Sequence, residues 1–543
     1  MTKRCWWKEA VVYQVYPRSF ADSNGDGIGD LQGLIGKLGY LSYLGVTAIW
    51  LSPIYQSPMH DFGYDISDYR AIDPVFGTID DVDHLIREAH ARSIAIIFDM
   101  VLNHTSIDHG WFTESRSSVD SPKRDFYIWR RPSDHKYPNN WYGAFGGRAW
   151  TRDPTTGYQY LHSFLVEQPD LNWRNEEMVK ALFHDMAFWF DRGVDGFRLD
   201  VINLIIKDAK LRNNPIGWGG RPRPYDLQRH LHDRNQPEAH AVLKRFRSWV
   251  DTYENKMLVG EIMVEKPGEP EMAASYQGNG DDELHEAFDF TFTWLPWNRR
   301  LWERSARRWY AALGEHRWPS WVLSNHDVAR AWSRYGHSSG RAKIAACFLL
   351  TQRGTPFLYY GEELGLPEAP VSRSRIQDPL GKRYWPFHRG RDGSRRPMPW
   401  DDSEHRGFSL TAPWLPSYEP SIPSVKRCMQ DPLSLLHVYR TLIALRTEDE
   451  VFRDGLIRWV SYGRSSPIMA YIRYREQEER VILLNFSSRT KKLDFTPIFQ
   501  HLHHQRLQIL FCTPNCTHQI ITATDAPNTL IGYQVIICSG VTA

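Results

Sequence analysis

The chain has 543 residues, of which 42% are hydrophobic and 24% are charged, and its formal net charge is +2. These values are ordinary for a folded globular protein, and the length is more than a single core usually serves, so two or three domains are expected. The near-neutral balance gives no support for nucleic acid or an anionic membrane as a partner.

Targeting signals and cysteines indicate the compartment. The first residues lack the apolar core of a signal peptide, and no apolar run is long enough to cross a membrane. The six cysteines show no disulfide-framework spacing, and Cys512 and Cys516 lack the second Cys or His pair that a zinc site needs. We therefore predict free thiols and a cytoplasmic protein that does not bind membranes.

In chain order, strand-like apolar runs alternate with helical patterns. The predicted helices include residues 81–92, 176–192 and 433–446. Strands are predicted over residues 10–16, 48–51, 94–100, 196–200, 257–260, 288–290, 321–324 and 356–360. Eight parallel strands with crossover helices close a barrel, so the predicted fold class is α/β, a (β/α)8 TIM barrel.

Two regions depart from this alternation. Residues 104–173 are rich in Pro, Gly, Trp, Asp and Tyr and show no helical pattern. Because this irregular insertion leaves from the C-terminal end of the third strand, we expect it to form a wall of the active-site cleft. Short β-type runs follow at 468–474, 480–486, 507–511 and 532–537. The predicted domains are the barrel (1–103 and 174–458), the insertion (104–173) and a C-terminal antiparallel β domain (459–543).

Acids, amides and imidazoles occur where four predicted strands end, at residues 99–104, 196–200, 259–261 and 324–327. Polar groups at the ends of several barrel strands form a shared active site. Side chains alternate along a strand, so Arg198 and Asp200 share a face, and the cation favours an ionised nucleophile. Glu261 follows an apolar run that favours the protonated acid. Each segment alone fits a structural role, but four in order indicate glycosidic bond cleavage.

The sequence also resembles a known family, the α-amylase superfamily (glycoside hydrolase family 13), and within it the α-glucosidase and oligo-1,6-glucosidase group. The resemblance covers essentially the whole chain and includes the segments GYDISDY at 63–69, QPDLN at 168–172 and GTPFLYYGE at 354–362. It implies a (β/α)8 barrel, a B domain after the third strand, a C-terminal β domain and no organic cofactor.

Carried over by position, the resemblance makes Asp200 the nucleophile, Glu261 the acid/base and Asp327 the carboxylate that grips the ring hydroxyls. The implied mechanism is retaining double displacement through a covalent glucosyl-enzyme. The other implied sugar contacts are the stacking platform Tyr64 and the side chains of His104, Phe164, Arg198 and His326.

The resemblance further implies exo action. In the glucosidase group, an Asp before the GYD motif and an Arg in a late RxPM segment hold the non-reducing end. Here these are Asp61 and Arg395, with Arg396 as the rival arginine. A salt-bridged pair at this place would block longer chains, whereas the alternative is a surface charge pair.

The loop at 22–30 places oxygen donors at alternate positions, as calcium loops do, although it is not an EF-hand. Related glucosidases carry a structural Ca²⁺ or Mg²⁺ in a similar loop, whereas the alternative is a metal-free turn. The implied ligands are Asp22, Asn24, Asp26, the carbonyl of Ile28, and Asp30.

Cues to linkage specificity conflict. Val201 follows the nucleophile, and in this group Val there accompanies α-1,6 cleavage. Residues 212–218 and 377–379 instead look like bacterial α-1,4-glucosidases. We therefore predict a broad exo-α-glucosidase that acts on small oligosaccharides as a monomer or homodimer. A sucrose isomerase or transglucosylase is the alternative within the family. A non-catalytic relative is disfavoured because all three carboxylates are present.

Overall fold

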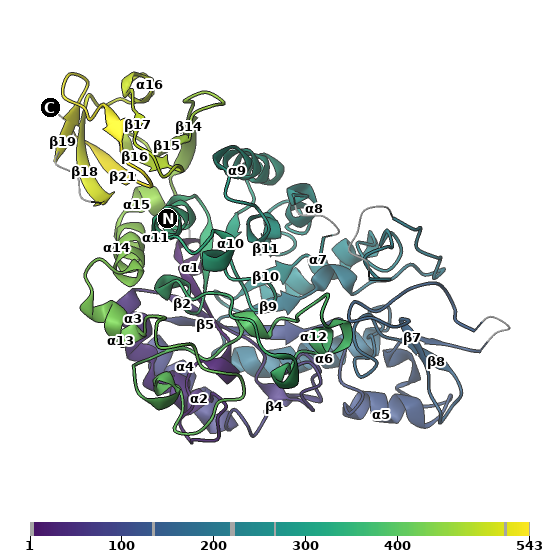
Figure 1. Cartoon of the computed structure of the whole chain (residues 1–543). Helices are drawn as coiled ribbons and strands as arrows, with labels where there is room; N and C mark the ends of the chain where they lie inside the picture. Colours follow the sequence, from purple (N-terminus) through teal and green to yellow (C-terminus); the bar gives the residue numbers. More distant parts are fainter. Residues whose placement is uncertain (1–4, 133–135, 218–222, 265–267, 515–518, 542–543) are drawn as a thin grey trace.

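The computed structural model describes residues 5–132, 136–217, 223–264, 268–514 and 519–541. Its central element is an eight-stranded sheet in the order β11-β10-β9-β5-β2-β1-β13-β12 (Figure 1). Every pairing along this order is parallel. The strands are β1 (Val12–Val15), β2 (Ala48–Leu51), β5 (Ala95–Val101), β9 (Gly196–Asp200), β10 (Met257–Glu261), β11 (Glu286–Phe288), β12 (Ser320–Val322) and β13 (Thr355–Tyr359).

A side-chain bond links the two ends of this strand order. Ser320 Oγ on β12 donates to the carbonyl of Ala287 on β11 at 2.8 Å. The predicted (β/α)8 barrel is confirmed. The sixth strand ends two residues earlier than expected, because Asp289 caps the 3-10 helix η4 (Phe290–Thr293) by accepting from the Thr291 amide, which ends β11 at Phe288.

Helices cover the outside of the sheet (Figure 1). The predicted helices correspond to α4 (Ile79–His90), α6 (Glu176–Asp191) and α14 (Leu435–Glu448). The start of α4 is fixed by a capping box between Thr78 and Asp81, which satisfies amide groups that the first helical turn leaves without partners. Further barrel helices are α7 (Glu238–Val250), α9 (Arg299–Leu313) and α11 (Ser339–Thr351).

The insertion is more regular than its composition indicates. It contains α5 (Gly110–Ser117) and a small sheet of β6 (Trp129–Arg130), β8 (Gln159–Leu161) and β7 (Trp150–Arg152). The expectation of a helix-free insertion was therefore wrong. The His109 ring caps α5, and the helix buries Phe112 against Trp129, with 5.6 Å between ring centroids. Such a short helix shows too little apolar periodicity to be recognised in a sequence.

The C-terminal region forms an antiparallel sheet in the order β14-β15-β16-β21-β18-β19. A buried arginine joins it to the barrel: Arg473 on β15 donates to the carbonyl of Thr351 at the end of α11 (2.7 Å) and to that of Gly455 (2.7 Å). Within the barrel, the buried Arg446 on α14 donates to the carbonyl of Gln352, which directly follows α11 (2.9 Å). The strands are β14 (Leu456–Val460), β15 (Ile468–Arg475), β16 (Glu478–Asn485), β18 (Arg506–Thr513), β19 (Ile520–Thr522) and β21 (Val535–Val541).

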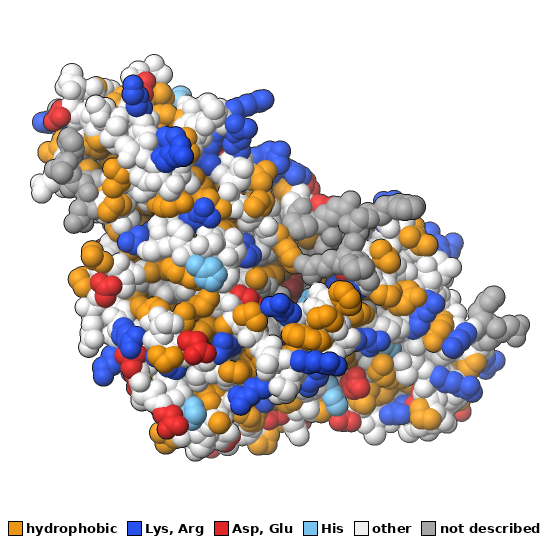
Figure 2. All heavy atoms as spheres, in the orientation of Figure 1, with side chains coloured by type: hydrophobic (Ala, Val, Ile, Leu, Met, Phe, Trp, Pro, Cys, Tyr) orange, Lys and Arg blue, Asp and Glu red, His pale blue; other side chains and the backbone are white. Residues whose placement is uncertain are grey.

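The structure also bears on the expectations about surface charge, membrane spans and cysteines. Figure 2 shows basic, acidic and apolar side chains interspersed over the face that it presents. Within the described ranges, no helix is both long and apolar enough to span a bilayer. Cys347, Cys428 and Cys538 have free thiols, but Cys512 is disulfide-bonded, so the expectation of free thiols throughout was wrong. Cys516 and Trp218, on which other expectations fell, lie outside the described residues.

Candidate active site

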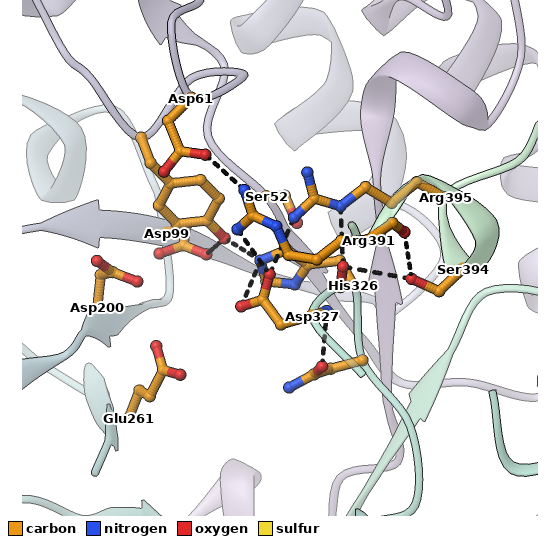
Figure 3. Close-up of polar contacts among 12 residues, drawn as sticks. Ser52, Asp61, Asp99, Asp200, Glu261, His326, Asp327, Arg391, Ser394 and Arg395 are labelled. Carbon is orange, nitrogen blue, oxygen red and sulfur yellow. Dashed lines mark hydrogen bonds and ion pairs between the residues drawn. The ribbon is translucent and has the colours of Figure 1, made fainter. Parts of the chain in front are cut away.

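The principal carboxylates lie at the C-terminal ends of neighbouring strands. Asp200 ends β9 and Glu261 ends β10, and these two strands pair in parallel. Figure 3 shows both carboxyl groups on the side toward which Asp327 also points. The barrel thus brings together the three acids that the strand-end pattern predicted.

Arg198 connects the acids. Its Nη1 donates to Asp200 Oδ1 at 2.8 Å and to Asp99 Oδ1 at 2.7 Å, and its Nη2 donates to Glu261 Oε2. The guanidinium is 1% exposed, so these bonds form away from bulk water. One buried cation therefore fixes the directions of both candidate catalytic carboxyl groups.

Burial and the neighbouring cation have opposite effects on the pKa values of these acids. Burial raises the pKa of Asp200, the neighbouring Glu261 adds to this, and Arg198 acts in the lowering direction. The sequence predicted only the influence of the arginine, which burial outweighs. Burial likewise raises the pKa of Asp99 to about 6 against Arg198.

Tyr64 and His326 form a stacked pair in the wall of the site. Their rings lie 5.4 Å apart at an angle of 4°, and Tyr64 Oη lies 2.7 Å from His326 Nε2 and donates to Asp99 at 3.0 Å. Gln14 Nε2 lies 2.8 Å from His326 Nδ1, which places the ring proton on Nε2 when the amide donates. Burial lowers the pKa of His326 to about 3, so the ring is neutral at physiological pH.

His104 and Phe164 join the same wall from the insertion side. The rings lie 5.1 Å apart, and His104 Nε2 lies 3.0 Å from the carbonyl of Tyr64. Burial lowers the pKa of His104 to about 4. Gln168 Nε2 contacts both the Tyr64 carbonyl (3.2 Å) and His104 Nε2 (3.0 Å). The QPDLN segment carried the signal for this contact, which the predicted site lacked.

The expected ion pair at the sugar end uses another arginine. Asp61 Oδ1 pairs with Arg391 Nη2 at 2.7 Å, whereas Arg395 pairs with Asp327 at 2.9 Å. The rival, Arg396, donates to the carbonyls of Pro416 and Ser417. The predicted Asp61–Arg395 pair was wrong because the two arginines flank the 3-10 turn η7 (Asp392–Ser394), which directs Arg391 to Asp61.

Arg391 also reaches Asp327, at 3.1 Å, so Asp327 has two cationic partners (Figure 3). Burial raises the pKa of the Asp327 carboxyl, yet its charged neighbours outweigh burial and hold the pKa well below its usual range. Asp61 differs, because burial raises its pKa to about 6 against the opposing effect of Arg391. Asp327 is therefore ionised over the whole working range of pH, and Asp61 only above about pH 6.

These groups line one cavity of about 700 Å³. We call the part of the lining formed by Asp61, Tyr64, His104, Asp327 and Arg391 the inner part, and the apolar remainder the outer part. The segment 223–234 also lines the cavity, and sequence reasoning missed it because the segment has no regular periodicity. Its lining residues are Arg223, Tyr225, Asp226, Gln228, Arg229, His230 and Arg234; apolar lining on the outer side comes from Val201, Met263, Val264, Phe290 and Trp294.

Val201 belongs to the apolar lining and directly follows Asp200 in the chain. It has left-handed backbone angles (φ 36°, ψ 45°), which a β-branched residue rarely adopts. Its side chain is 3% exposed and belongs to a small apolar cluster with Phe145, Phe164, Leu204 and Leu380. Val201 therefore contributes apolar surface beside Asp200.

The candidate metal loop lies apart from these acids, and its side chains bond the loop's own amides. Asp22 accepts from Gly25 (2.7 Å) and Gly27 (2.8 Å), and Asp26 accepts from Ile28 (2.8 Å). Asp30 caps α2 (Leu31–Gly36) through the Gly33 amide at 2.6 Å. Among the described residues no three acidic, histidine or cysteine side chains form a ready metal cage. The donors, including Asn24, are all oxygens, which fit Ca²⁺ or Mg²⁺ chemically.

Comparison with known proteins agrees with this geometry. Residues 14–455 match the family model for the α-amylase catalytic domain. The chain is 43% identical to a probable α-glucosidase of Rhizobium meliloti (strain 1021), over 90% of this chain and 91% of the relative. It is 40% identical to an oligo-1,6-glucosidase of Parageobacillus thermoglucosidasius, over 92% and 93%. The crystal structure of XgtA, an α-glucosyl transfer enzyme, superposes with a TM-score of 0.89 at 39% identity, covering 99% of this chain and all of that one. The chain belongs to the α-amylase family and is a glycoside hydrolase.

Proposed function

We propose that this protein is a retaining exo-α-glucosidase that releases α-glucose from the non-reducing end of short α-glucosides. The observation that carries this proposal is the pair of carboxylates, Asp200 and Glu261, held by the single guanidinium of Arg198. Two acids fixed side by side in a pocket are the requirement for retaining hydrolysis.

In the first step, Asp200 attacks the anomeric carbon while Glu261 gives its proton to the glycosidic oxygen, and the leaving sugar departs. In the second step, Glu261 takes a proton from water, the hydroxide attacks the anomeric carbon, and the bond to Asp200 breaks. The ionised Asp327 holds ring hydroxyls, and its charge opposes the positive charge that develops on the ring in both transition states.

The exo part of the proposal rests on Asp61 and Arg391. Their 2.7 Å ion pair lies at the inner part of the cavity, where a longer chain would have to continue. A charge-assisted pair at this position excludes a further sugar unit and hydrogen-bonds the terminal one. Terminal glucose should therefore be the product, whatever the length of the substrate.

The test is hydrolysis of maltose, isomaltose, sucrose and maltotetraose side by side, with the products separated. Release of glucose from the non-reducing end of all susceptible substrates supports the proposal. Rapid internal cleavage of starch would contradict exo action. The relative rates on maltose and isomaltose would decide between the conflicting linkage cues.

A transglucosylase or sucrose isomerase remains the second candidate, because XgtA is described as an α-glucosyl transfer enzyme. Both activities use the same covalent intermediate and differ in whether water or a sugar hydroxyl attacks it. Glucose plus fructose from sucrose would favour hydrolysis, whereas isomeric disaccharides or longer glucosides would favour transfer.

We also propose that the loop of Asp22, Asn24, Asp26, Ile28 and Asp30 holds a structural Ca²⁺ or Mg²⁺. A bound ion would tie the loop to the segment of Ser409, which already bonds Asp22 at 2.5 Å. Metal analysis of the purified protein and a melting temperature lowered by chelator would support this. An unchanged melting temperature and no bound metal would contradict it.

The cytoplasmic location and the monomer or homodimer are likewise proposals. The free thiols of Cys347, Cys428 and Cys538 support a reducing compartment, whereas the disulfide at Cys512 counts against it. Cell fractionation would test the location, and sedimentation would test the oligomeric state. Recovery in a secreted fraction would overturn the first, and a larger assembly would overturn the second.

A further inference from the structure

We propose that Asp378 is a positioning residue that acts through Arg391 and holds its guanidinium where it closes the sugar end of the pocket. This inference rests on the proposed exo function and adds to it a residue outside the pocket. Among the described residues, the lining of the cavity includes Arg391 but not Asp378.

The Asp378 carboxylate bonds both the side chain and the main chain of Arg391. Oδ1 accepts from Arg391 Nε at 3.1 Å and from Nη2 at 2.7 Å, and Oδ2 accepts from the Arg391 amide at 2.7 Å. The carboxylate is fully buried. Three bonds from one rigid group fix both the backbone position and the side-chain torsions of the arginine, which otherwise has many rotamers.

The opposite side of the same guanidinium faces the pocket. Nη2 donates to Asp61 at 2.7 Å, Nη1 donates to Asp327 at 3.1 Å, and the group lies 4.9 Å from the Phe145 ring of the insertion. Asp378 is thus the anchor behind the arginine, and the two pocket acids are in front of it. Without Asp378, the Arg391 side chain would be flexible and its guanidinium would not be held where it can pair with both Asp61 and Asp327.

A neighbouring buried acid has a different task in the same loop. Asp392 Oδ2 accepts from the amides of Gln377 (2.7 Å) and Asp378 (3.1 Å), so it stabilises the loop backbone. It is as fully buried as Asp378. Among the hydrogen bonds of the described residues, the Asp392 side chain makes none to Arg391, so Asp392→Ala is a control that weakens the loop backbone while keeping the Asp378 carboxylate.

Asp61 reports on where the guanidinium lies. The charged and titratable groups that influence it are Arg391, Arg395 and Asp378, and Tyr16 lies near enough to be affected by it in turn. Burial raises the pKa of Asp61 to about 6, and Arg391 is the leading opposing influence. If the guanidinium moves away, the pKa of Asp61 rises further and the pH below which the pair is lost moves upward.

The experiment compares Asp378→Ala with Asp392→Ala in the full chain, after thermal unfolding has shown that each variant folds. For Asp378→Ala we expect KM for maltose or isomaltose to rise about tenfold, the loss expected for a hydrogen bond to a charged group, while kcat stays within about threefold. The acidic limb of the KM profile should move to higher pH. For Asp392→Ala we expect a lower melting temperature with KM and the acidic limb close to wild type.

A double-mutant cycle with Arg391→Ala completes the test. If Asp378 acts through Arg391, the double variant should match Arg391→Ala alone in kcat/KM. Additive effects, an unchanged KM in Asp378→Ala, or an equal change in Asp392→Ala would overturn the inference. Should Asp378→Ala not fold, Asp378→Asn keeps one acceptor for the guanidinium, and the same comparison applies with a smaller expected rise in KM.

Failure of this inference differs from failure of the proposed function. Wild-type protein that releases no terminal glucose from any substrate would refute the function itself. Active wild-type protein with an indifferent Asp378→Ala variant would refute the positioning role alone. Glucose-induced stabilisation against heating, measured over pH, gives the same information about the sugar end without relying on hydrolysis.

Discussion

The inner and outer parts of the cavity are built in different ways. In the inner part, polar side chains have defined partners: Asp61 pairs with Arg391, Asp327 pairs with two arginines, and Tyr64 bonds His326. The outer part relies more on apolar surface, from Val201 to Trp294, which is 48% exposed. Directional bonds specify one ligand orientation, whereas apolar surface accepts several. We therefore expect strict recognition of the terminal glucose and tolerance toward the leaving group.

The largest effect should follow from removing Asp200, the proposed nucleophile, because the chemical step depends on it for every substrate. Asp200→Asn keeps the shape and the bond to Arg198 but cannot form the glucosyl-enzyme. We expect kcat to fall by about 10⁴-fold or more on every substrate, as in other enzymes that lose a group acting in the chemical step. Initial rates with several leaving groups would measure this, and substantial turnover by a folded Asp200→Asn variant would contradict the assignment.

Loss of Glu261, the proposed proton donor, should lower the hydrolysis rate by an amount that depends on the leaving group of the substrate. Glu261→Gln cannot donate a proton, so hydrolysis of isomaltose should fall by about 10²- to 10⁴-fold. A p-nitrophenyl α-glucoside needs little protonation and should lose far less in the first step. Comparing burst and steady-state rates on both substrates would show this. An equal loss in every phase on both substrates would argue against Glu261 as the proton donor.

The sugar end should show a pH dependence of its own. Since burial raises the pKa of Asp61 to about 6, its carboxylate becomes protonated as the pH falls through this value and the pair with Arg391 weakens. We expect KM to rise by about tenfold or less between pH 7 and pH 5. The Asp61→Asn variant should have a high KM that lacks this acidic limb, and an unaltered limb in that variant would assign it to another group.

The smallest effect is expected at Val201, in the apolar lining beside Asp200. Val201→Thr replaces a methyl by a hydroxyl on the leaving-group side and should shift the ratio of kcat/KM for isomaltose and maltose toward maltose. Because Val and Thr are nearly equal in size, we expect the ratio to change by less than the about 10-fold that marks the low end for a single methylene in an apolar pocket. Val201→Ala is the control for lost volume, and a ratio that stays constant in both variants would remove Val201 from linkage selection.

How much of this was predictable differs between the two parts of the cavity. The strand ends placed Asp200, Glu261 and Asp327 together because parallel strands bring their C-terminal ends to one rim. Arg391 was missed and Arg395 was chosen in its place. A 3-10 turn lies between the two arginines, and its geometry decides which guanidinium reaches Asp61. The segment 223–234 was missed for a related reason, since irregular backbone carries no period from which its position could be inferred.

The buried arginines at the edge of the barrel have a consequence for any attempt to exchange parts between relatives. Arg473 belongs to the C-terminal sheet, yet its guanidinium donates to the carbonyl of Thr351 at the end of a barrel helix. Cutting the chain before β15 would leave that carbonyl without its donor inside apolar surroundings, at a cost of about 1–3 kcal/mol for the unpaired group alone. The C-terminal sheet is accordingly a fused support of the catalytic barrel, and chimaeras should carry α11, α14 and the sheet as one transferable block.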